Sequence, residues 1–332
     1  MLKLWELFSC QVIRVAAGVA GLLLAFITLA IKTYNCVTLG ICKSDKEMNG
    51  KTVIITGANS GIGYETALDI AKRGARVIMA CRNMELAQKA RDEIATKSKN
   101  ENVVVRQLDL SSPKSIRDFA QDINLNETKL DVLIHNAGMA TFTKKTTTEG
   151  LEITMATNQF GPFLLTHLLI DLLRRSKPSR IVIVASELYR IANVNMENTN
   201  PVNVFPVYLY YVSKYANIMF TLELARRLEG SGVTANCLHP GVINSGIWRS
   251  VPFPMNLPLK LIAKIFFKNA EQGAQTSIHL AVSDEVDGVN GKYFMDCREH
   301  CLSRGVSDMA RARKYWDVCE KLVKLRPDDP KI

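Results

Sequence analysis

Residues 51–63 read KTVIITGANSGIG, and this stretch decides the fold of the chain. Its first six residues are mostly β-branched, which predicts a buried parallel strand. Three glycines follow within seven residues, spaced G-x-x-x-G-x-G, and residues 64–73 then predict a helix that Gly74 ends. Glycines allow a tight bend and close backbone approach, while a helix N-terminus offers N–H groups to a pyrophosphate. The stretch therefore predicts a dinucleotide-binding turn between a strand and a helix.

The next predicted strand bears on which dinucleotide is bound. Residues 76–80 form that strand, and Cys81, Arg82 and Asn83 follow it. In dinucleotide folds an acidic residue near this point binds the ribose 2′-hydroxyl, whereas an arginine accepts a 2′-phosphate. Here the first acidic residue is Glu85, and Arg82 stands in place. The sequence therefore favours NADPH over NADH, with a plain surface arginine as the alternative.

Further strands alternate with helical patterns along the chain. Apolar runs predict strands at 103–108, 130–134, 180–184 and 233–238, and a charged amphipathic run predicts a helix at 84–98. This alternation is typical of a parallel, doubly wound α/β sheet. The chain has 332 residues, enough for one large domain. We therefore expect a single Rossmann-type α/β domain.

Polar residues follow several predicted strands, where ligands bind in such sheets. Asp109 follows the third strand, and its carboxylate could accept from an adenine amine or cap the next helix. We interpret His135, after the fourth strand, as a packed residue rather than a base. Ser186 follows the fifth strand, where its hydroxyl could bond a substrate oxygen or cap the strand end.

Tyr210 and Lys214 lie four residues apart in a run that continues as an apolar helical face. Positions four apart share one face of a helix, so a phenol would lie near an ammonium group. A free phenol has a pKa of about 10, and a nearby cation lowers it. The pair predicts a tyrosine that exchanges a proton with a substrate near neutral pH, with a tyrosine packed beside a solvated lysine as the alternative. Tyr208 and Tyr211 lie nearby, but only Tyr210 has the four-residue spacing.

The order and spacing of these residues resemble the short-chain dehydrogenase/reductase superfamily. The resemblance runs from about Lys51 to about Cys301. Within the superfamily, the chain is most similar to the membrane-anchored retinol dehydrogenase-like subgroup. The features that point there are an apolar N-terminal segment, an insert at 188–207 and the motifs at 157–166, 239–241, 266–268, 271–276 and 291–294.

The resemblance implies a role for each site residue. Tyr210 would be the general acid or base, Ser186 would orient and polarise the substrate oxygen, and Lys214 would lower the pKa of the tyrosine and bind the nicotinamide ribose. Asn158 would hold a proton-relaying water, with a structural role in its helix as the alternative. NADP(H) would be bound by Gly57, Asn59, Ser60, Gly61, Ile62, Gly63, Arg82, Asp109, Asn136, Ala137, Gly138, Tyr210, Lys214, Pro240, Gly241, Ile243 and Ser245.

We therefore expect an NADPH-dependent oxidoreductase that interconverts a lipophilic alcohol and its aldehyde or ketone, with retinol and retinal as the leading pair. Sterols, polyprenols and lipid aldehydes are alternative substrates. A non-catalytic nucleotide-binding scaffold at membranes is an alternative of a different class, since a fold does not determine a function. The intact set of Ser186, Tyr210 and Lys214 argues against it.

The N-terminal segment predicts a membrane anchor. Residues 12–31 are apolar except for Arg14, and twenty such residues can cross a bilayer; a cleaved signal peptide, whose apolar part is normally shorter, is the alternative. Lys3 and Arg14 lie on the N-terminal side of the apolar segment, and four lysines follow it closely. We therefore expect the bulk of the chain in the cytosol at the endoplasmic reticulum, or alternatively at a mitochondrial membrane or lipid droplet. The expected divisions are an anchor at 1–32, a linker at 33–49, a catalytic domain at 50–302 and a C-terminal helix and tail at 303–332.

Residues 251–268 predict a basic amphipathic helix beside the expected substrate entrance. Lys260, Lys264 and Lys268 recur every four residues opposite an apolar face. Such a helix can lie on an anionic membrane surface, with a core-facing helix as the alternative, so we expect contact with membrane lipid. At the other end of the chain, Trp316 predicts a packed C-terminal helix, which we expect to be followed by a disordered end.

Composition narrows the class of partner. A formal charge of +10 suits nucleic acid, a membrane surface or an anionic cofactor, but the basic tail lacks the interleaved aromatics of a nucleic-acid groove. We therefore expect no nucleic-acid partner. The sequence is compatible with a homo-oligomer. Eight scattered cysteines indicate a reduced compartment, and Cys297, His300 and Cys301 do not complete a zinc site.

Overall fold

The computed structural model describes residues 37–243 and 267–332, together with the single positions 19, 26, 29 and 33. The first half of the domain alternates strands and helices as the sequence predicts. In chain order its elements are β1 (Thr52–Thr56), α2 (Gly61–Lys72), β2 (Arg76–Cys81), α3 (Met84–Ser98), β3 (Val103–Gln107), α4 (Pro113–Asn126) and β4 (Val132–His135).

The second half begins with a long helix that is interrupted by a π-helical segment, η1. Its elements are α5 (Ile153–Met155), η1 (Ala156–Phe160), α6 (Gly161–Arg175), β5 (Ser179–Val184), η2 (Glu187–Ile191), α7 (Pro206–Arg227), β6 (Val233–His239), α9 (Ala270–Val282), η4 (Asp284–Val286), β7 (Tyr293–Met295), β8 (Arg298–His300) and α10 (Met309–Leu322).

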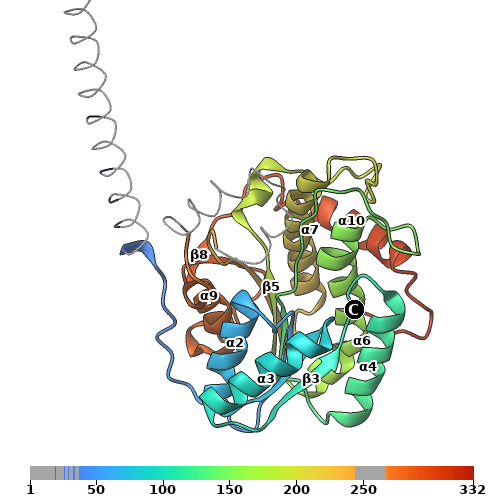
Figure 1. The fold of residues 1–332 in the computed structure, drawn as a ribbon. Helices are drawn as coiled ribbons and strands as arrows, with labels where there is room; N and C mark the ends of the chain where they lie inside the picture. Colours follow the sequence, from blue (N-terminus) through green and yellow to red (C-terminus); the bar gives the residue numbers. More distant parts are fainter. Residues whose placement is uncertain (1–18, 20–25, 27–28, 30–32, 34–36, 244–266) are drawn as a thin grey trace, which may run out of the picture.

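The strands form one eight-stranded sheet in the order β3-β2-β1-β4-β5-β6-β7-β8 (Figure 1). Strands β1 to β7 are parallel, and β8 pairs antiparallel with β7 at the edge. The order reverses between β1 and β4, which is where doubly wound sheets bind their ligands. The predicted Rossmann-type fold is confirmed, whereas the sequence did not predict β7 or the antiparallel edge strand.

Each face of the sheet carries its own hydrophobic core. On β1, Val53 and Ile55 pack into the core beneath α2, α3 and α9, while Ile54 packs into the core beneath α4, α6 and α7. Successive side chains of a strand point to opposite faces, so a strand covered on both sides is apolar throughout. This explains why all five residues of β1 are buried.

The C-terminal end is packed and not disordered, so the prediction for it was wrong. The chain ends beside α4 and α6 (Figure 1). Arg117 on α4 forms a 2.7 Å ion pair with the buried Asp329, and Arg227 donates to the Ile332 carbonyl at 3.0 Å. These long-range polar contacts fix a segment whose own composition is typical of a loop.

Two predicted membrane features fall largely outside the described residues, namely the anchor at 12–31 and the amphipathic helix at 251–266. Among the residues that the structure does describe, no helix has both the length and the apolar character needed to span a membrane. Lys268, which the sequence places at the end of that predicted helix, lies within the described residues. It forms an isolated parallel bridge with Ile243 and a largely buried ion pair with Asp296.

Candidate active site

The glycine turn after β1 has a backbone shape that side chains would block. Gly57 and Gly61 have φ values of +68° and +60°, in the left-handed region that favours glycine. A Cβ on Gly63 would lie 2.4 Å from Nδ2 of Asn136 and 2.5 Å from the Gly57 carbonyl oxygen. The close approach of α2 to the strand ends therefore requires glycine at position 63.

The N-terminus of α2 lacks a side-chain cap. Ser60 occupies the cap position, but its hydroxyl forms no capping hydrogen bond, and the first turn of the helix has no acidic residue. The first N–H groups and the positive end of the helix dipole are thus open to an anion. Helices α3, α4, α9 and α10 differ, because their caps accept hydrogen bonds through the side chains of Asn83, Ser112, Asn269 and Asp308. Beside this helix end, Asn59 and Ile62 are half-buried and Ser60 is exposed.

Asn136 connects the end of β4 to the glycine turn. Its Nδ2 donates to the Thr56 carbonyl at 2.9 Å, and the N–H groups of Asn136 and Ala137 both donate to Thr56 Oγ1 at 3.0 Å. Gly138 then passes close to α7, since a Cβ there would lie 3.5 Å from Nζ of Lys214. The triplet therefore shapes the turn and brings the backbone close to the lysine.

Asp109 and Arg82 lie at the ends of β3 and β2. One carboxylate oxygen of Asp109 accepts from the N–H and the hydroxyl of Ser111, at 2.9 and 2.7 Å. That oxygen thus stabilises the loop before α4, and the side chain of Ser112, not Asp109, caps the helix. The guanidinium of Arg82 is exposed and makes no hydrogen bond or ion pair within the described part of the chain, so it can receive an anion.

Ser186, Tyr210 and Lys214 meet where β5 ends. Lys214 is 3% exposed, and its Nζ donates to the Val184 carbonyl at 2.7 Å and lies 5.5 Å from the centre of the Tyr210 ring. Ser186 is buried, its Oγ accepts from the Leu188 N–H at 3.2 Å, and its side chain acts to lower the pKa of Tyr210. The structure therefore brings together three residues that the sequence separates by up to 28 positions.

Burial controls the ionisation of this group. It raises the pKa of Tyr210 to about 12, although the neighbouring Ser186 side chain acts in the opposite direction. It lowers the pKa of Lys214 to about 8. Lys214 is not among the groups that shift the pKa of Tyr210 in this structure, and its role in lowering that pKa stays a prediction. The lysine nitrogen is directed to Val184, and desolvation of the phenol dominates.

Asn158 lies within η1 and forms three hydrogen bonds. Its Oδ1 accepts from the Met139 N–H at 2.8 Å, and its Nδ2 donates to the Met139 carbonyl at 2.9 Å and to Ser213 Oγ at 3.0 Å. Met139 follows Gly138, and Ser213 precedes Lys214. Asn158 thus joins two segments of the site, and the structural role weighed from the sequence is present. The sequence did not predict the π-helical turn, a feature that is frequent at functional sites.

The loop after β6 carries Pro240, Gly241 and Ile243. Gly241 has a φ of +94°, and Ile243 is 6% exposed. A Cβ on Gly273 of α9 would lie 2.5 Å from Cδ1 of Ile243, so the Ile243 side chain packs closely on the helix at this glycine. Ser245, the last predicted cofactor residue, lies outside the described residues.

Two buried histidines lie at strand ends. Nε2 of His135 is 2.8 Å from Thr166 Oγ1, and the residue is 3% exposed, which confirms the prediction of a packed residue. Burial lowers the pKa of His135 to about 3. Burial also lowers the pKa of His239 to about 4, and its Nδ1 has no hydrogen-bond partner among the described residues. The sequence drew attention to His239 only through its place before Pro240 and Gly241.

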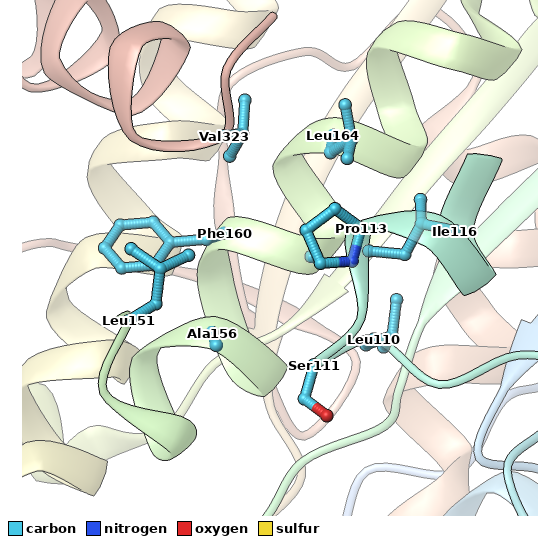
Figure 2. A pocket seen from close by; sticks show the side chains of 10 residues that line it. Leu110, Ser111, Pro113, Ile116, Leu151, Ala156, Phe160, Leu164 and Val323 are labelled. Carbon is cyan, nitrogen blue, oxygen red and sulfur yellow. The ribbon is translucent and has the colours of Figure 1, made fainter. Parts of the chain in front are cut away.

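A small pocket lies between the start of α4, the η1–α6 junction and Val323 (Figure 2). Its lining is apolar, with Ser111 as the one polar side chain that the figure labels. Ser186, Tyr210 and Lys214 do not line it. This pocket is therefore separate from the candidate active site.

Residues 51–253 match the short chain dehydrogenase family, and the chain belongs to that family. It is an oxidoreductase of the short-chain dehydrogenase/reductase class that acts on CH–OH groups, and such enzymes bind NAD or NADP. It is similar to Retinol dehydrogenase 14 of Homo sapiens, with 44% identity over 294 residues covering 84% of this chain and 88% of that protein. It is similar to Retinol dehydrogenase 12 of Mus musculus, with 42% identity over 285 residues covering 85% and 90%. A crystal structure of an uncharacterized protein from Mycobacterium Paratuberculosis has a TM-score of 0.69 and 32% identity, covering 86% of this chain and 98% of that one.

Proposed function

We propose that the protein is an NADP(H)-dependent oxidoreductase that interconverts a lipophilic alcohol and its aldehyde or ketone, with retinol and retinal as the leading pair. The observation that supports this best is the meeting of Ser186, Tyr210 and Lys214 at the end of β5. Similarity to two retinol dehydrogenases favours a retinoid among lipophilic substrates. Sterols, polyprenols and other lipid aldehydes are the alternatives.

The residues around the glycine turn fit a dinucleotide. The uncapped N-terminus of α2 suits a pyrophosphate, and an added Cβ on Gly61 would meet nothing within 4 Å, so space is open beside this helix end. Arg82 has an exposed guanidinium that suits a ribose 2′-phosphate, which favours NADP(H) over NAD(H). Bound NADPH supplies the hydride for reduction of a carbonyl carbon.

Tyr210 acts as the general acid during carbonyl reduction. With a pKa of about 12 its hydroxyl is protonated at neutral pH, and it gives this proton to the substrate oxygen. Ser186 accepts the Leu188 N–H through Oγ, so its own proton is available to polarise the same oxygen. In alcohol oxidation the roles reverse, and Tyr210 must first lose its proton.

Lys214 and Asn158 assist Tyr210 in its role as general acid. Lys214 lies beside both Tyr210 and Gly138, a position from which it can bind the nicotinamide ribose. Asn158 holds the segments that carry Gly138 and Lys214, and its family role as the holder of a proton-relaying water is compatible with these bonds. A positioned lysine and asparagine would then return protons from solvent to Tyr210.

A lipophilic substrate fits the loops around this site. Ile191, Phe205 and Val242 are exposed by 63%, 64% and 52%, and they lie in the segments that follow β5 and β6.

We place the domain at the cytosolic face of the endoplasmic reticulum, with a mitochondrial membrane or lipid droplet as alternatives. The apolar run at 12–31 would anchor it, and the basic run at 251–268 would contact membrane lipid. We assign the catalytic domain to residues 50–302. Assembly of the chain into a homo-oligomer is compatible with this proposal.

The decisive test measures NADPH oxidation by the detergent-solubilised full chain with all-trans-retinal, and with NADH as the cofactor control. We expect turnover with NADPH, little with NADH, and a fall of about 10²–10⁴-fold in Tyr210→Phe while NADPH binding persists. Tyr211→Phe is the matched control and should keep its rate.

The other outcomes each favour a named alternative. Turnover with other lipid aldehydes or ketones but not with retinal would keep the oxidoreductase and exclude the retinoid. Tight NADPH binding without turnover of any carbonyl would favour the nucleotide-binding scaffold. Near-normal turnover by Tyr210→Phe would show that the acid has been assigned to the wrong residue.

A further inference from the structure

The hairpin turn between β7 and β8 has an unusual backbone. Asp296 and Cys297 form this two-residue turn, and both have positive φ values, of 51° and 58°. Such turns favour Asn, Asp and Gly. The aspartate therefore adopts this left-handed conformation readily, whereas the cysteine adopts it at a cost in strain. The Cys297 N–H donates to Thr276 Oγ1 of α9 at 3.2 Å, which holds the turn against the helix. Backbone strain of this kind persists where the surrounding structure requires it, often near functional sites.

The Asp296 carboxylate binds two segments that are distant in the sequence. Its Oδ1 pairs with Nζ of Lys268, and the two side chains are only 19% and 12% exposed. The same oxygen accepts from the Gly40 N–H at 3.4 Å. A Cβ on Gly40 would lie 1.9 Å from the Asp296 carbonyl oxygen, so the linker can pass here only with a glycine.

Lys268 in turn holds the loop after β6. Its N–H donates to the Val242 carbonyl at 2.9 Å, and its backbone forms a parallel bridge with Ile243. Its side chain lies against Gly241, where an added Cβ would be 2.7 Å from Cδ of the lysine. A largely buried lysine without its carboxylate would leave an uncompensated charge, so loss of Asp296 should displace Lys268 and loosen the loop.

We propose that Asp296 is a positioning residue for the dinucleotide, because through Lys268 it fixes Gly241–Ile243 in the shape that receives the nicotinamide end. This inference rests on the proposed function, which assigns that loop to the cofactor. The Asp296 carboxylate also accepts from the Gly40 N–H in the linker. The same side chain therefore contacts both the linker and Lys268, which holds the cofactor loop.

The first test compares Asp296→Asn with Glu299→Gln in the full-length, detergent-solubilised protein. Asparagine tolerates the left-handed turn and preserves side-chain size, so only the charge changes. Glu299 lies on the same hairpin, in an ion pair with Lys292 that is about half exposed, and is the matched control. We expect Asp296→Asn to weaken NADPH binding about tenfold by fluorescence titration, with a smaller fall in kcat at saturating NADPH. Glu299→Gln should bind NADPH like the wild type.

A second readout does not depend on the cofactor. In the cofactor-free protein, amide hydrogen exchange across residues 237–243 should be faster in Asp296→Asn and unchanged in Glu299→Gln. Lys268→Gln should reproduce both effects, and the double variant should be no worse than either single one, since both remove the same contact. Lys268→Gln also carries the test if Asp296→Asn does not fold.

The results separate this inference from the function on which it rests. NADPH affinity within twofold of wild type in both single variants would overturn the positioning role while leaving the oxidoreductase intact. Additive losses in the double variant would also overturn it, because they would indicate two independent contacts. A wild-type protein that binds neither NADPH nor NADH would overturn the proposed function and this inference with it.

Discussion

Nζ of Lys214 donates a 2.7 Å hydrogen bond to the carbonyl oxygen of Val184, the last residue of β5. The bond ties the helix that carries Tyr210 to the centre of the sheet. It also holds a lysine nitrogen where water is excluded, because Lys214 is 3% exposed. Burial therefore lowers the pKa of Lys214 to about 8, and this shift has consequences for stability.

Thermal stability should depend on pH through Lys214. Between pH 8 and 10 the folded protein releases the lysine proton, whereas the unfolded chain, with the ordinary lysine pKa of 10.5, retains it. The unfolded state then binds more protons, so the contribution of this group to stability rises with pH. We expect the difference in Tm between wild type and Lys214→Met to move in favour of wild type across this range. A flat or falling difference would contradict the burial of the amine.

The two reaction directions should differ in their pH dependence because burial raises the pKa of Tyr210 to about 12. The protonated phenol needed for carbonyl reduction is present throughout pH 6–10, so that rate should stay nearly flat. Alcohol oxidation needs the phenolate, and its rate should rise by about tenfold per pH unit. Steady-state rates at saturating cofactor, with folding checked by circular dichroism, would test this. A plateau of oxidation below pH 8 would mean that the pKa is lowered in the working enzyme.

Arg82 should control the choice between dinucleotides. Hydrogen bonds to charged groups are worth about 1.5–3 kcal/mol, so Arg82→Ala should weaken NADPH binding by about 10–100-fold. NADH affinity should change little, because NADH lacks the 2′-phosphate. Arg313→Ala, an exposed arginine on α10, is the control. Equal weakening for both cofactors would exclude selective contact with the phosphate.

Trp316 should be essential for the stability of the domain and not only of its C-terminal helix. The side chain is 1% exposed and packs on Phe163 with ring centres 4.8 Å apart, and Arg227 lies 4.5 Å from its ring centre. Large-to-small changes of buried aromatics cost about 3–5 kcal/mol, and we expect such a loss for Trp316→Ala in urea unfolding. Lys314→Ala, exposed on the same helix, should change stability little. A loss below about 1 kcal/mol for Trp316→Ala would mean that α10 is peripheral.

The sequence by itself determined the elements that depend on near neighbours. The helix predicted at 84–98 is α3, and the six predicted strands are all present, because side-chain periodicity and turn residues act over a few positions. The glycine turn could be predicted for the same reason. The four-residue spacing of Tyr210 and Lys214 likewise puts both residues on one helix, whatever the rest of the chain does.

Only the tertiary structure decided the contacts between distant segments. Strands β7 and β8 have three residues each, too few to show a period, and the packing of the C-terminal end rests on Asp329 meeting Arg117 from 212 positions away. The direction of the Lys214 nitrogen and the raised pKa of Tyr210 also belong to this group, since desolvation depends on everything that surrounds a side chain. Local patterns specify which residues can act, whereas burial and long-range contacts specify how they ionise and what holds them.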